Sequence, residues 1–286
     1  MLTKNIRFNN FILKKKKFNV IKILKNLKLD YYKGKLKIPS SLSEDYVYSF
    51  DRKLINKYKN FSNFRVIGMG GSTLGTQAIY HFLKKKIKKN FYFTDNLQNQ
   101  IDNKKNIINI VVSKSGNTLE TISNSNILLK KNKKNIFITE KKNNYLRNLA
   151  EKIRAEVVEH KNYIGGRYSV LSEVGMLPAQ LMGLNEKRFK RLNYLIENKK
   201  FVNQLVQNVE NTLSLIKNKK YISVILNYDE KSENLFKWYQ QLIAESLGKK
   251  SKGLFPVISS MPKDNHSLMQ FFLDGPNKIF FTFLSC

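Results

Sequence analysis

A permanent positive charge follows two glycines in residues 165–172, which read Gly-Gly-Arg-Tyr-Ser-Val-Leu-Ser. Glycine lets the backbone come close to a ligand, and Arg167 keeps its charge at any working pH. This pattern predicts an anion site at the start of a helix over residues 169–181. An arginine paired with a surface carboxylate is the plainer alternative.

Two further segments have the composition of phosphate-binding loops. Residues 66–75 (Val-Ile-Gly-Met-Gly-Gly-Ser-Thr-Leu-Gly) and 111–118 (Val-Val-Ser-Lys-Ser-Gly-Asn-Thr) each lead from an apolar run into a helical pattern. Backbone N–H groups and the positive end of the helix dipole converge at such a junction. The first loop also fits a plain tight turn or, with Asp95 as the acid, an imperfect dinucleotide fingerprint. In the second loop several hydroxyls can surround a phosphate, and Thr118 can cap the helix with its side-chain oxygen.

Two residues near the C-terminal end of the sequence could move protons. Glu245 lies one turn before the end of a helical pattern over residues 232–247, on a strip with Gln241. A glutamate in that position is usually solvated. His266 stands among polar turn residues, and an imidazole that titrates near neutrality suits proton delivery. We expect His160, which follows a predicted strand, at the surface.

The elements that must position these residues alternate between short β-branched runs and longer amphipathic ones. Strand–helix–strand repeats at this spacing predict parallel βαβ units and a doubly wound sheet. A second set of strands after a helical middle predicts a second sheet of the same kind, incomplete in its strands. Strands are expected at residues 64–68, 91–94, 107–113, 135–139, 155–159, 221–226, 254–258 and 278–283, and helices at 73–86, 118–131, 144–152, 169–181, 186–216 and 232–247.

The composition is that of a globular chain of 286 residues with 42% apolar residues. Its net charge of +31 would normally suggest nucleic acid or an anionic membrane as a partner. The lysines are spread along the whole chain, together with many asparagines and isoleucines, and are not clustered in one basic segment. We therefore expect neither nucleic acid nor a membrane as a partner. Cys286 is the single cysteine, which excludes an intrachain disulfide and a multi-cysteine zinc site and favours a cytoplasmic location.

Five of these segments, in order from about residue 64 to 283, resemble the glucose-6-phosphate isomerase family, whose domains have the sugar-isomerase (SIS) fold. The strongest likeness is at residues 165–178. The further motifs are at 66–75, at 113–118, at Ala-Glu-Ser-Leu-Gly-Lys over 244–249 and at Asp-Asn-His-Ser over 264–267. The resemblance implies an aldose–ketose isomerase that needs neither cofactor nor metal and interconverts D-glucose 6-phosphate and D-fructose 6-phosphate through an enediolate.

The resemblance also implies a role for each candidate residue. Glu245 would be the general base, Arg167 would stabilise the enediolate, and His266 would assist ring opening, reaching into the site of the neighbouring subunit of a homodimer. The substrate, a hexose 6-phosphate, would be bound by Gly71, Ser72, Ser113, Lys114, Ser115 and Thr118.

The expected organisation is an N-terminal segment (1–60), a first SIS-like domain (61–165) and a helical connection with a second, truncated SIS-like domain (166–286). Family members continue with a helix that carries a lysine of the site, so a truncated product is expected here. Three alternatives stay open: a bifunctional phosphoglucose/phosphomannose isomerase or other SIS enzyme, a non-catalytic sugar-phosphate-binding SIS protein, and an inactive fragment. The Ser-Gly-Asn form at 115–117 favours the first of these.

Overall fold

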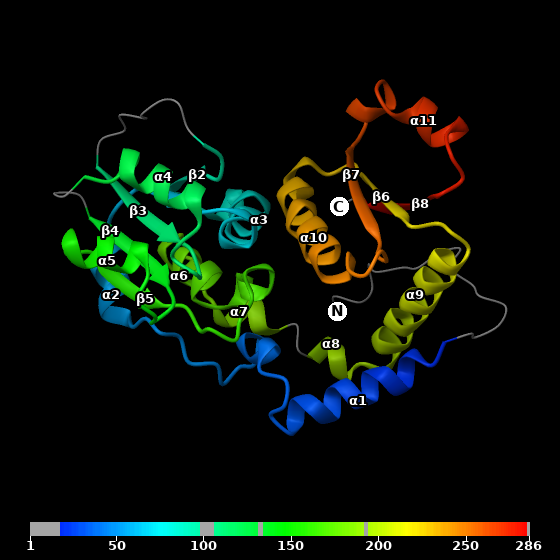
Figure 1. The fold of residues 1–286 in the computed structure, drawn as a ribbon, viewed down its shortest axis with the longest axis horizontal. Helices are drawn as coiled ribbons and strands as arrows, with labels where there is room; N and C mark the ends of the chain where they lie inside the picture. Colours follow the sequence, from blue (N-terminus) through cyan, green and yellow to red (C-terminus); the bar gives the residue numbers. More distant parts are fainter. Residues whose placement is uncertain (1–17, 98–105, 131–133, 192–193, 285–286) are drawn as a thin grey trace. The chain divides into compact units, whose positions relative to one another are not determined.

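The structure, a computed structural model, describes residues 18–97, 106–130, 134–191 and 194–284 (Figure 1). These residues form two compact units, each with its own parallel sheet. We call Ile38–Phe189 with Lys231–Leu242 the five-stranded unit. The three-stranded unit lies within Met1–Lys37, Lys190–Glu230 and Ile243–Cys286. Helix α10 (Glu233–Leu247) begins in the first unit and ends in the second.

The larger sheet is parallel throughout and has the strand order β2-β1-β3-β4-β5. Its middle strand β3 is buried at every position. This explains why all of its residues except Asn109 are apolar. The expected strands are confirmed to within one or two residues. The strands are β1 (Asn63–Ile67), β2 (Asn90–Thr94), β3 (Ile107–Val112), β4 (Asn135–Thr139) and β5 (Glu156–Glu159).

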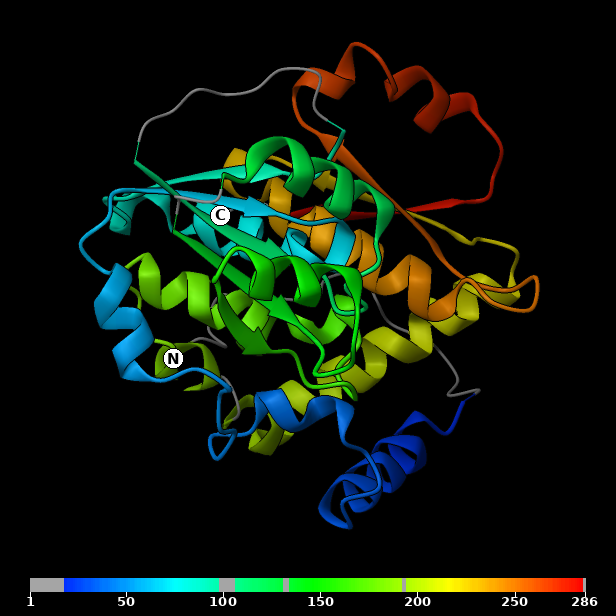
Figure 2. The ribbon, with the colours of Figure 1, turned by 60° about the vertical axis from the view of Figure 1, so that its left-hand side comes forward.

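Helices cover both faces of this sheet, so it is doubly wound as predicted (Figure 2). Side chains alternate along each strand: Val66 pairs with Ile110 on one face, and Ile67 with Val111 on the other. The first face packs against α3 and α6, and the second against α4 and α5. The helices of this unit are α2 (Arg52–Tyr58), α3 (Leu74–Phe82), α4 (Leu119–Leu128), α5 (Tyr145–Lys152) and α6 (Glu173–Leu181), with part of α10.

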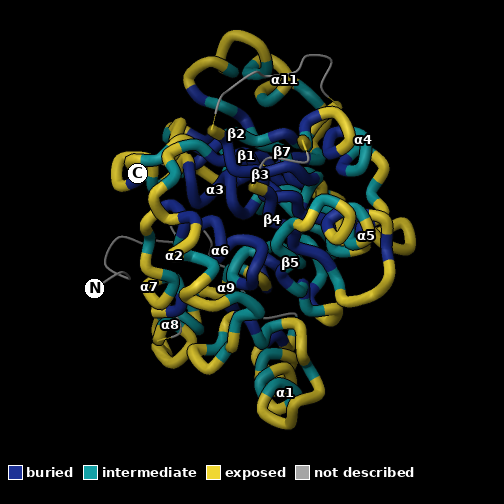
Figure 3. The backbone as a smooth tube through the Cα atoms, turned by 90° about the vertical axis from the view of Figure 1, so that its left-hand side faces the viewer, coloured by how far each residue is buried: buried dark blue, intermediate teal, exposed yellow. Residues whose placement is uncertain are grey.

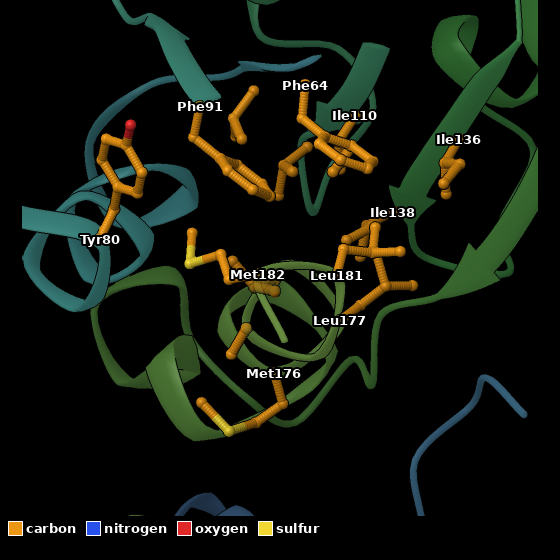
Figure 4. Packing of buried hydrophobic residues seen from close by; sticks show 14 of the residues in the cluster. Phe64, Tyr80, Phe91, Ile110, Ile136, Ile138, Met176, Leu177, Leu181 and Met182 are labelled. Carbon is orange, nitrogen blue, oxygen red and sulfur yellow. The ribbon is translucent and has the colours of Figure 1, made fainter. Parts of the chain in front are cut away.

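The main core lies between the sheet and α6 (Figures 3 and 4). Phe64 and Phe91 stack with ring centroids 4.8 Å apart, and Leu177 and Leu181 face them from the helix. Full burial of one such side chain contributes about 1.5–3 kcal/mol. Residues 166–189, which the sequence-based division groups with the second sheet, therefore pack against the first sheet.

The smaller sheet has the order β7-β6-β8, and all its strands are parallel. Helix α11 packs on it through Met269 and Phe272, whose ring meets that of Phe281 at 5.4 Å. Helix α1 packs against α9. The elements of this unit are α1 (Val20–Tyr32), α8 (Tyr194–Glu197), α9 (Lys199–Lys217), β6 (Ile222–Asn227), β7 (Phe255–Ser260), α11 (Met269–Asp274) and β8 (Ile279–Leu284). The division between the units falls within α7 (Lys187–Lys190).

Three of the expected helices are broken in the structure. The helix expected over 73–86 divides into α3 and the 3-10 segment η4 (Lys84–Lys86). The helix expected over 169–181 is a 3-10 segment, η5 (Gly166–Leu171), followed by α6, because Ser172 has an extended backbone (φ −92°, ψ −165°). The helix expected over 186–216 divides into α7, α8 and α9, and Asn198 caps the last of these by accepting a hydrogen bond from Phe201 N. Every helix that the structure describes is too short or too polar to cross a lipid bilayer.

Candidate functional site

The five-stranded sheet has a topological switch point at the carboxyl ends of β1 and β3. These strands are neighbours, yet β1 leads to α3 on one face and β3 leads to α4 on the other. In open parallel sheets, ligands bind where neighbouring strands diverge in this way. The two predicted phosphate-binding loops leave these two strands. The fold therefore places both loops at the same edge of the sheet.

The glycine loop after β1 touches the backbone of the arginine turn. A Cβ atom on Gly71 would lie 2.3 Å from the carbonyl carbon of Gly166 and 2.6 Å from the nitrogen of Arg167. Only a residue without a side chain fits there. The hydroxyl of Ser169 lies 2.7 Å from the Gly166 oxygen and 3.3 Å from the Gly71 oxygen. Gly71, its neighbour Ser72 and Arg167 are thus brought together in one unit.

The hydroxyl loop after β3 is organised by its first and last residues. Ser113 Oγ lies 3.0 Å from Thr118 Oγ1 and accepts a hydrogen bond from Gly116 N at 3.2 Å. The expectation that the Thr118 side chain caps α4 is wrong: Thr118 occupies the N-cap position but makes no capping bond. Its hydroxyl contacts Ser113 instead. Ser115 is exposed, and its Oγ accepts a bond from Asn117 N at 3.3 Å.

Lys114 forms an ion pair with the carboxylate of Glu140. Its Nζ lies 3.6 Å from Glu140 Oε1, and both side chains are partly shielded from solvent. The Lys114 carbonyl also accepts a bond from Glu140 N at 3.1 Å, so the pair joins this loop to the end of β4. A doubly charged phosphate at the loop would compete with Glu140 for the ammonium group.

Helix α10 contributes two side chains to the arginine turn and the glycine loop. Trp238 Nε1 donates a hydrogen bond to the Arg167 carbonyl at 3.1 Å. The amide Nε2 of Gln241 lies 2.9 Å from the position that a Cβ of Gly70 would take. Sequence reasoning noted Gln241 only as a helix neighbour of Glu245. Gln241 lies one turn before Glu245 and therefore on the same face of α10. A polar amide at that position was the sequence feature that could have indicated this contact.

The other two predicted site residues belong to the three-stranded unit. Glu245 lies on the face of α10 that carries Gln241, one turn further along, and is exposed. His266 is exposed between the 3-10 segment η8 (Lys263–Asn265) and α11. Asp264 shapes this turn by accepting bonds from Ser259 Oγ at 2.9 Å and Ser260 N at 2.8 Å. The roles of Glu245 and His266 stay predictions.

His160 is buried, so the expectation that it lies at the surface is wrong. It is 2% exposed directly after β5, and its backbone nitrogen donates to the Thr139 carbonyl of β4 at 2.8 Å. Its Nδ1 lies 3.0 Å from the Lys161 carbonyl, which suits a ring protonated at that nitrogen. Burial lowers the pKa of His160, with a smaller opposing contribution from the bond to that carbonyl.

This pKa shift predicts a pH-dependent stability. Because the folded pKa lies below the unfolded value of about 6.5, the unfolded chain binds more protons at mildly acidic pH. The free energy of unfolding should therefore fall as pH is lowered through about 6.5. Urea unfolding at pH 7.5 and 5.5 measures this, with His160→Gln expected to reduce the difference. An unchanged difference in the variant would assign the effect to other groups.

Two other possibilities for the site can be compared with the structure. Asp95, the candidate acid of a dinucleotide site, accepts a hydrogen bond from Gln77 Nε2 at 2.6 Å. Among the described residues, no group of three histidines, cysteines or carboxylates is close enough to hold a metal ion. The two loops, the arginine turn and α10 supply hydroxyls, glycine backbone, an amide, a lysine and an arginine, which suit an anionic, hydroxyl-rich ligand.

Fold and site together define a doubly wound α/β protein of the sugar-isomerase type, with its polar loops at the topological switch point. A family model described as phosphoglucose isomerase matches residues 51–257. The chain belongs to the phosphoglucose isomerase family.

Curated relatives agree with this assignment. The glucose-6-phosphate isomerase of Methanocaldococcus jannaschii is 34% identical over 257 residues, which are 80% of this chain and 62% of that protein. The enzyme of the same name from Mycoplasmopsis synoviae is 32% identical over 248 residues, which are 77% of this chain and 57% of the relative. The chain thus spans about three fifths of the length of these relatives.

Solved structures show the same fold. A hypothetical protein of Thermus thermophilus aligns with a TM-score of 0.72 at 23% identity and covers 92% of this chain and 69% of its own. A glucose-6-phosphate isomerase of Chlamydia trachomatis aligns with a TM-score of 0.60 at 21% identity, covering 81% of this chain and 51% of its own.

Proposed function

We propose that this chain acts in the interconversion of D-glucose 6-phosphate and D-fructose 6-phosphate, a cofactor-free aldose–ketose isomerisation through an enediolate. The observation that carries the proposal is the backbone contact of Gly71 with the Arg167 turn beside the hydroxyl loop. This contact supports a site in which phosphate-binding groups and a fixed cation act on the same ligand. The names of the relatives and the family model support the same reaction.

In this mechanism, Ser113, Lys114, Ser115 and Thr118 hold the phosphate, while Gly71 and Ser72 contact the sugar. His266, supplied across the interface of a homodimer, assists opening of the pyranose ring. Glu245 then takes the proton from C2 of the open aldose and returns it to C1, while the hydroxyl proton moves from O2 to O1. No electrons leave the substrate. Arg167 stabilises the negative oxygen of the enediolate between the two proton transfers.

The decisive experiment follows glucose 6-phosphate formation from fructose 6-phosphate by the purified chain. Turnover supports the proposal, and mannose 6-phosphate as a second substrate tests for a bifunctional isomerase. Binding of fructose 6-phosphate without turnover would show that catalysis needs residues beyond this chain. A folded chain that neither binds nor converts the sugar phosphate would refute the proposal. We expect the protein in the cytoplasm, in agreement with its single cysteine.

The phosphate role of the hydroxyl loop predicts a binding defect. Ser113→Ala removes a buried hydroxyl that would donate to a charged phosphate oxygen, a bond that contributes about 1.5–3 kcal/mol. Affinity for both inorganic phosphate and fructose 6-phosphate should fall at least about tenfold in isothermal titration calorimetry. The control is Ser125→Ala, which removes a buried hydroxyl from α4 outside the loop. Equal affinities in the two variants would rule Ser113 out as a phosphate ligand.

A further inference from the structure

A fully buried carboxylate follows the arginine turn along the chain, and no step of the proposed mechanism uses it. Glu173 is 0% exposed and is the first residue of α6, six residues after Arg167. Glutamate is rarely buried in this way unless it is paired. Here the Tyr46 hydroxyl lies 3.0 Å and 2.9 Å from the two carboxylate oxygens, and Ser49 N donates to Oε1 at 3.0 Å.

Both donors come from one irregular segment, residues 43–51, between the 3-10 segment η2 (Ile38–Leu42) and α2. The segment is held together by its aromatic rings: Tyr48 contacts Tyr46 edge-on at 5.3 Å and stacks on Phe50 at 5.1 Å. Segment η2 in turn packs against η5, the segment that contains Arg167. The carboxylate of Glu173 thus anchors segment 43–51, which follows directly on the segment η2 that contacts η5.

Buried hydrogen bonds connect Glu173 to the arginine turn along the chain. Its neighbour Ser172 donates twice to the Ser169 carbonyl, from its backbone nitrogen at 2.9 Å and from its hydroxyl at 2.7 Å. The hydroxyl of Ser169 donates to the Gly166 carbonyl at 2.7 Å. Both serine side chains are completely buried. A shift at the start of α6 would therefore pass directly to the backbone on either side of Arg167.

We propose that Glu173 is a positioning residue for Arg167, which it holds in place through the buried serines and the 43–51 segment. This inference rests on the proposed function. A cation lowers the barrier to a charged intermediate only when its position is set before the charge develops. Loss of the Glu173 anchor should therefore reduce kcat while KM changes little, because the phosphate is held by the separate hydroxyl loop.

Two substitutions at Glu173 separate its hydrogen bonds from its volume. Glu173→Ala removes both acceptors. Glu173→Gln keeps one oxygen for Ser49 N, and its amide can donate to the Tyr46 oxygen, so most of the anchor is retained. Tyr46→Phe removes the hydroxyl that donates to Glu173 and leaves the carboxylate in place. This variant replaces Glu173→Ala in the test if Glu173→Ala does not fold. Tyr80→Phe is the matched control, since the hydroxyl of this buried tyrosine on α3 accepts a bond from Lys84 Nζ at 2.6 Å and does not contact Glu173.

The test is hydrogen exchange of the full chain, read at the amides of Tyr168 and Ser172, which bond to Gly165 and Ser169. Loss of a bond to a charged group should accelerate their exchange at least about tenfold in Glu173→Ala, less in Glu173→Gln, and not in Tyr80→Phe. In the kinetic assay, kcat should fall about tenfold in the alanine variant with KM within a factor of about two, and glutamine should restore most of it.

The outcomes distinguish a failure of the positioning role of Glu173 from a failure of the proposed isomerase function. Faster exchange confined to residues 43–51 would overturn the inference, because Glu173 would then hold only that segment and not the arginine turn. A raised KM with unchanged kcat would also overturn it. If the wild-type chain neither binds nor converts fructose 6-phosphate, the proposed function fails, and exchange at Tyr168 and Ser172 still decides whether Glu173 holds the turn.

Discussion

Replacement of Glu245 by glutamine is expected to lower kcat for fructose 6-phosphate isomerisation by about 10³-fold while the substrate still binds. Glutamine keeps the size of the side chain but cannot take a proton from carbon, so the loss should be confined to the chemical step. KM should stay within about twofold of the wild-type value, since only transition-state stabilisation is removed. The coupled assay with glucose 6-phosphate as product measures both constants.

The matched control lies on the same helix. Glu233→Gln changes a glutamate at the start of α10 that pairs with Lys237 at 2.8 Å, and it should leave kcat unchanged. Turnover that survives in the Glu245 variant would remove Glu245 from the mechanism. Equal losses in both variants would point to a general effect of charge on α10.

Much of the fold could be predicted from local patterns. The run from Ile107 to Val112 identifies a central strand, since only a strand covered on both faces is apolar at nearly every position. Glycine at the two strand-to-helix junctions likewise identifies the loops of the switch point. The break at Ser172 could not be predicted, because the apolar pattern on either side continues with helical spacing. It is tertiary packing of η5 and α6 that decides the backbone there.

The candidate site was harder to predict for a physical reason. His160 follows a strand and carries a polar ring, so its sequence position indicates the surface, yet tertiary packing leaves it only 2% exposed. The Thr118 hydroxyl could bond either to a backbone N–H group in the first turn of α4 or to Ser113. In the structure it contacts Ser113 Oγ and makes no capping bond. The contact of Gly71 with Gly166 joins residues 95 positions apart, and glycine has no side chain whose pattern could indicate a distant partner.

That glycine contact gives the strongest test of the site within the five-stranded unit. Gly71→Ala would put a methyl group 2.3 Å from the carbonyl carbon and 2.5 Å from the carbonyl oxygen of Gly166. These are backbone atoms, so the two loops must separate. Overpacking costs about 1–3 kcal/mol, and a backbone clash belongs at the upper end of that range. We therefore expect the free energy of unfolding to fall by about 3 kcal/mol in urea titrations.

The same contact provides its own control. Gly166→Ala adds the same methyl group on the opposite side, where the nearest atom is the Gly71 Cα at 3.9 Å, an ordinary contact. It should leave the free energy of unfolding within about 0.5 kcal/mol of the wild type. Separation of the loops in Gly71→Ala should also weaken fructose 6-phosphate binding by more than about tenfold, since Gly71 and Ser72 then leave Arg167. Equal stability of the two variants would mean that the loops do not touch at Gly71, and the proposed site would lose the contact that joins the glycine loop to the backbone of Arg167.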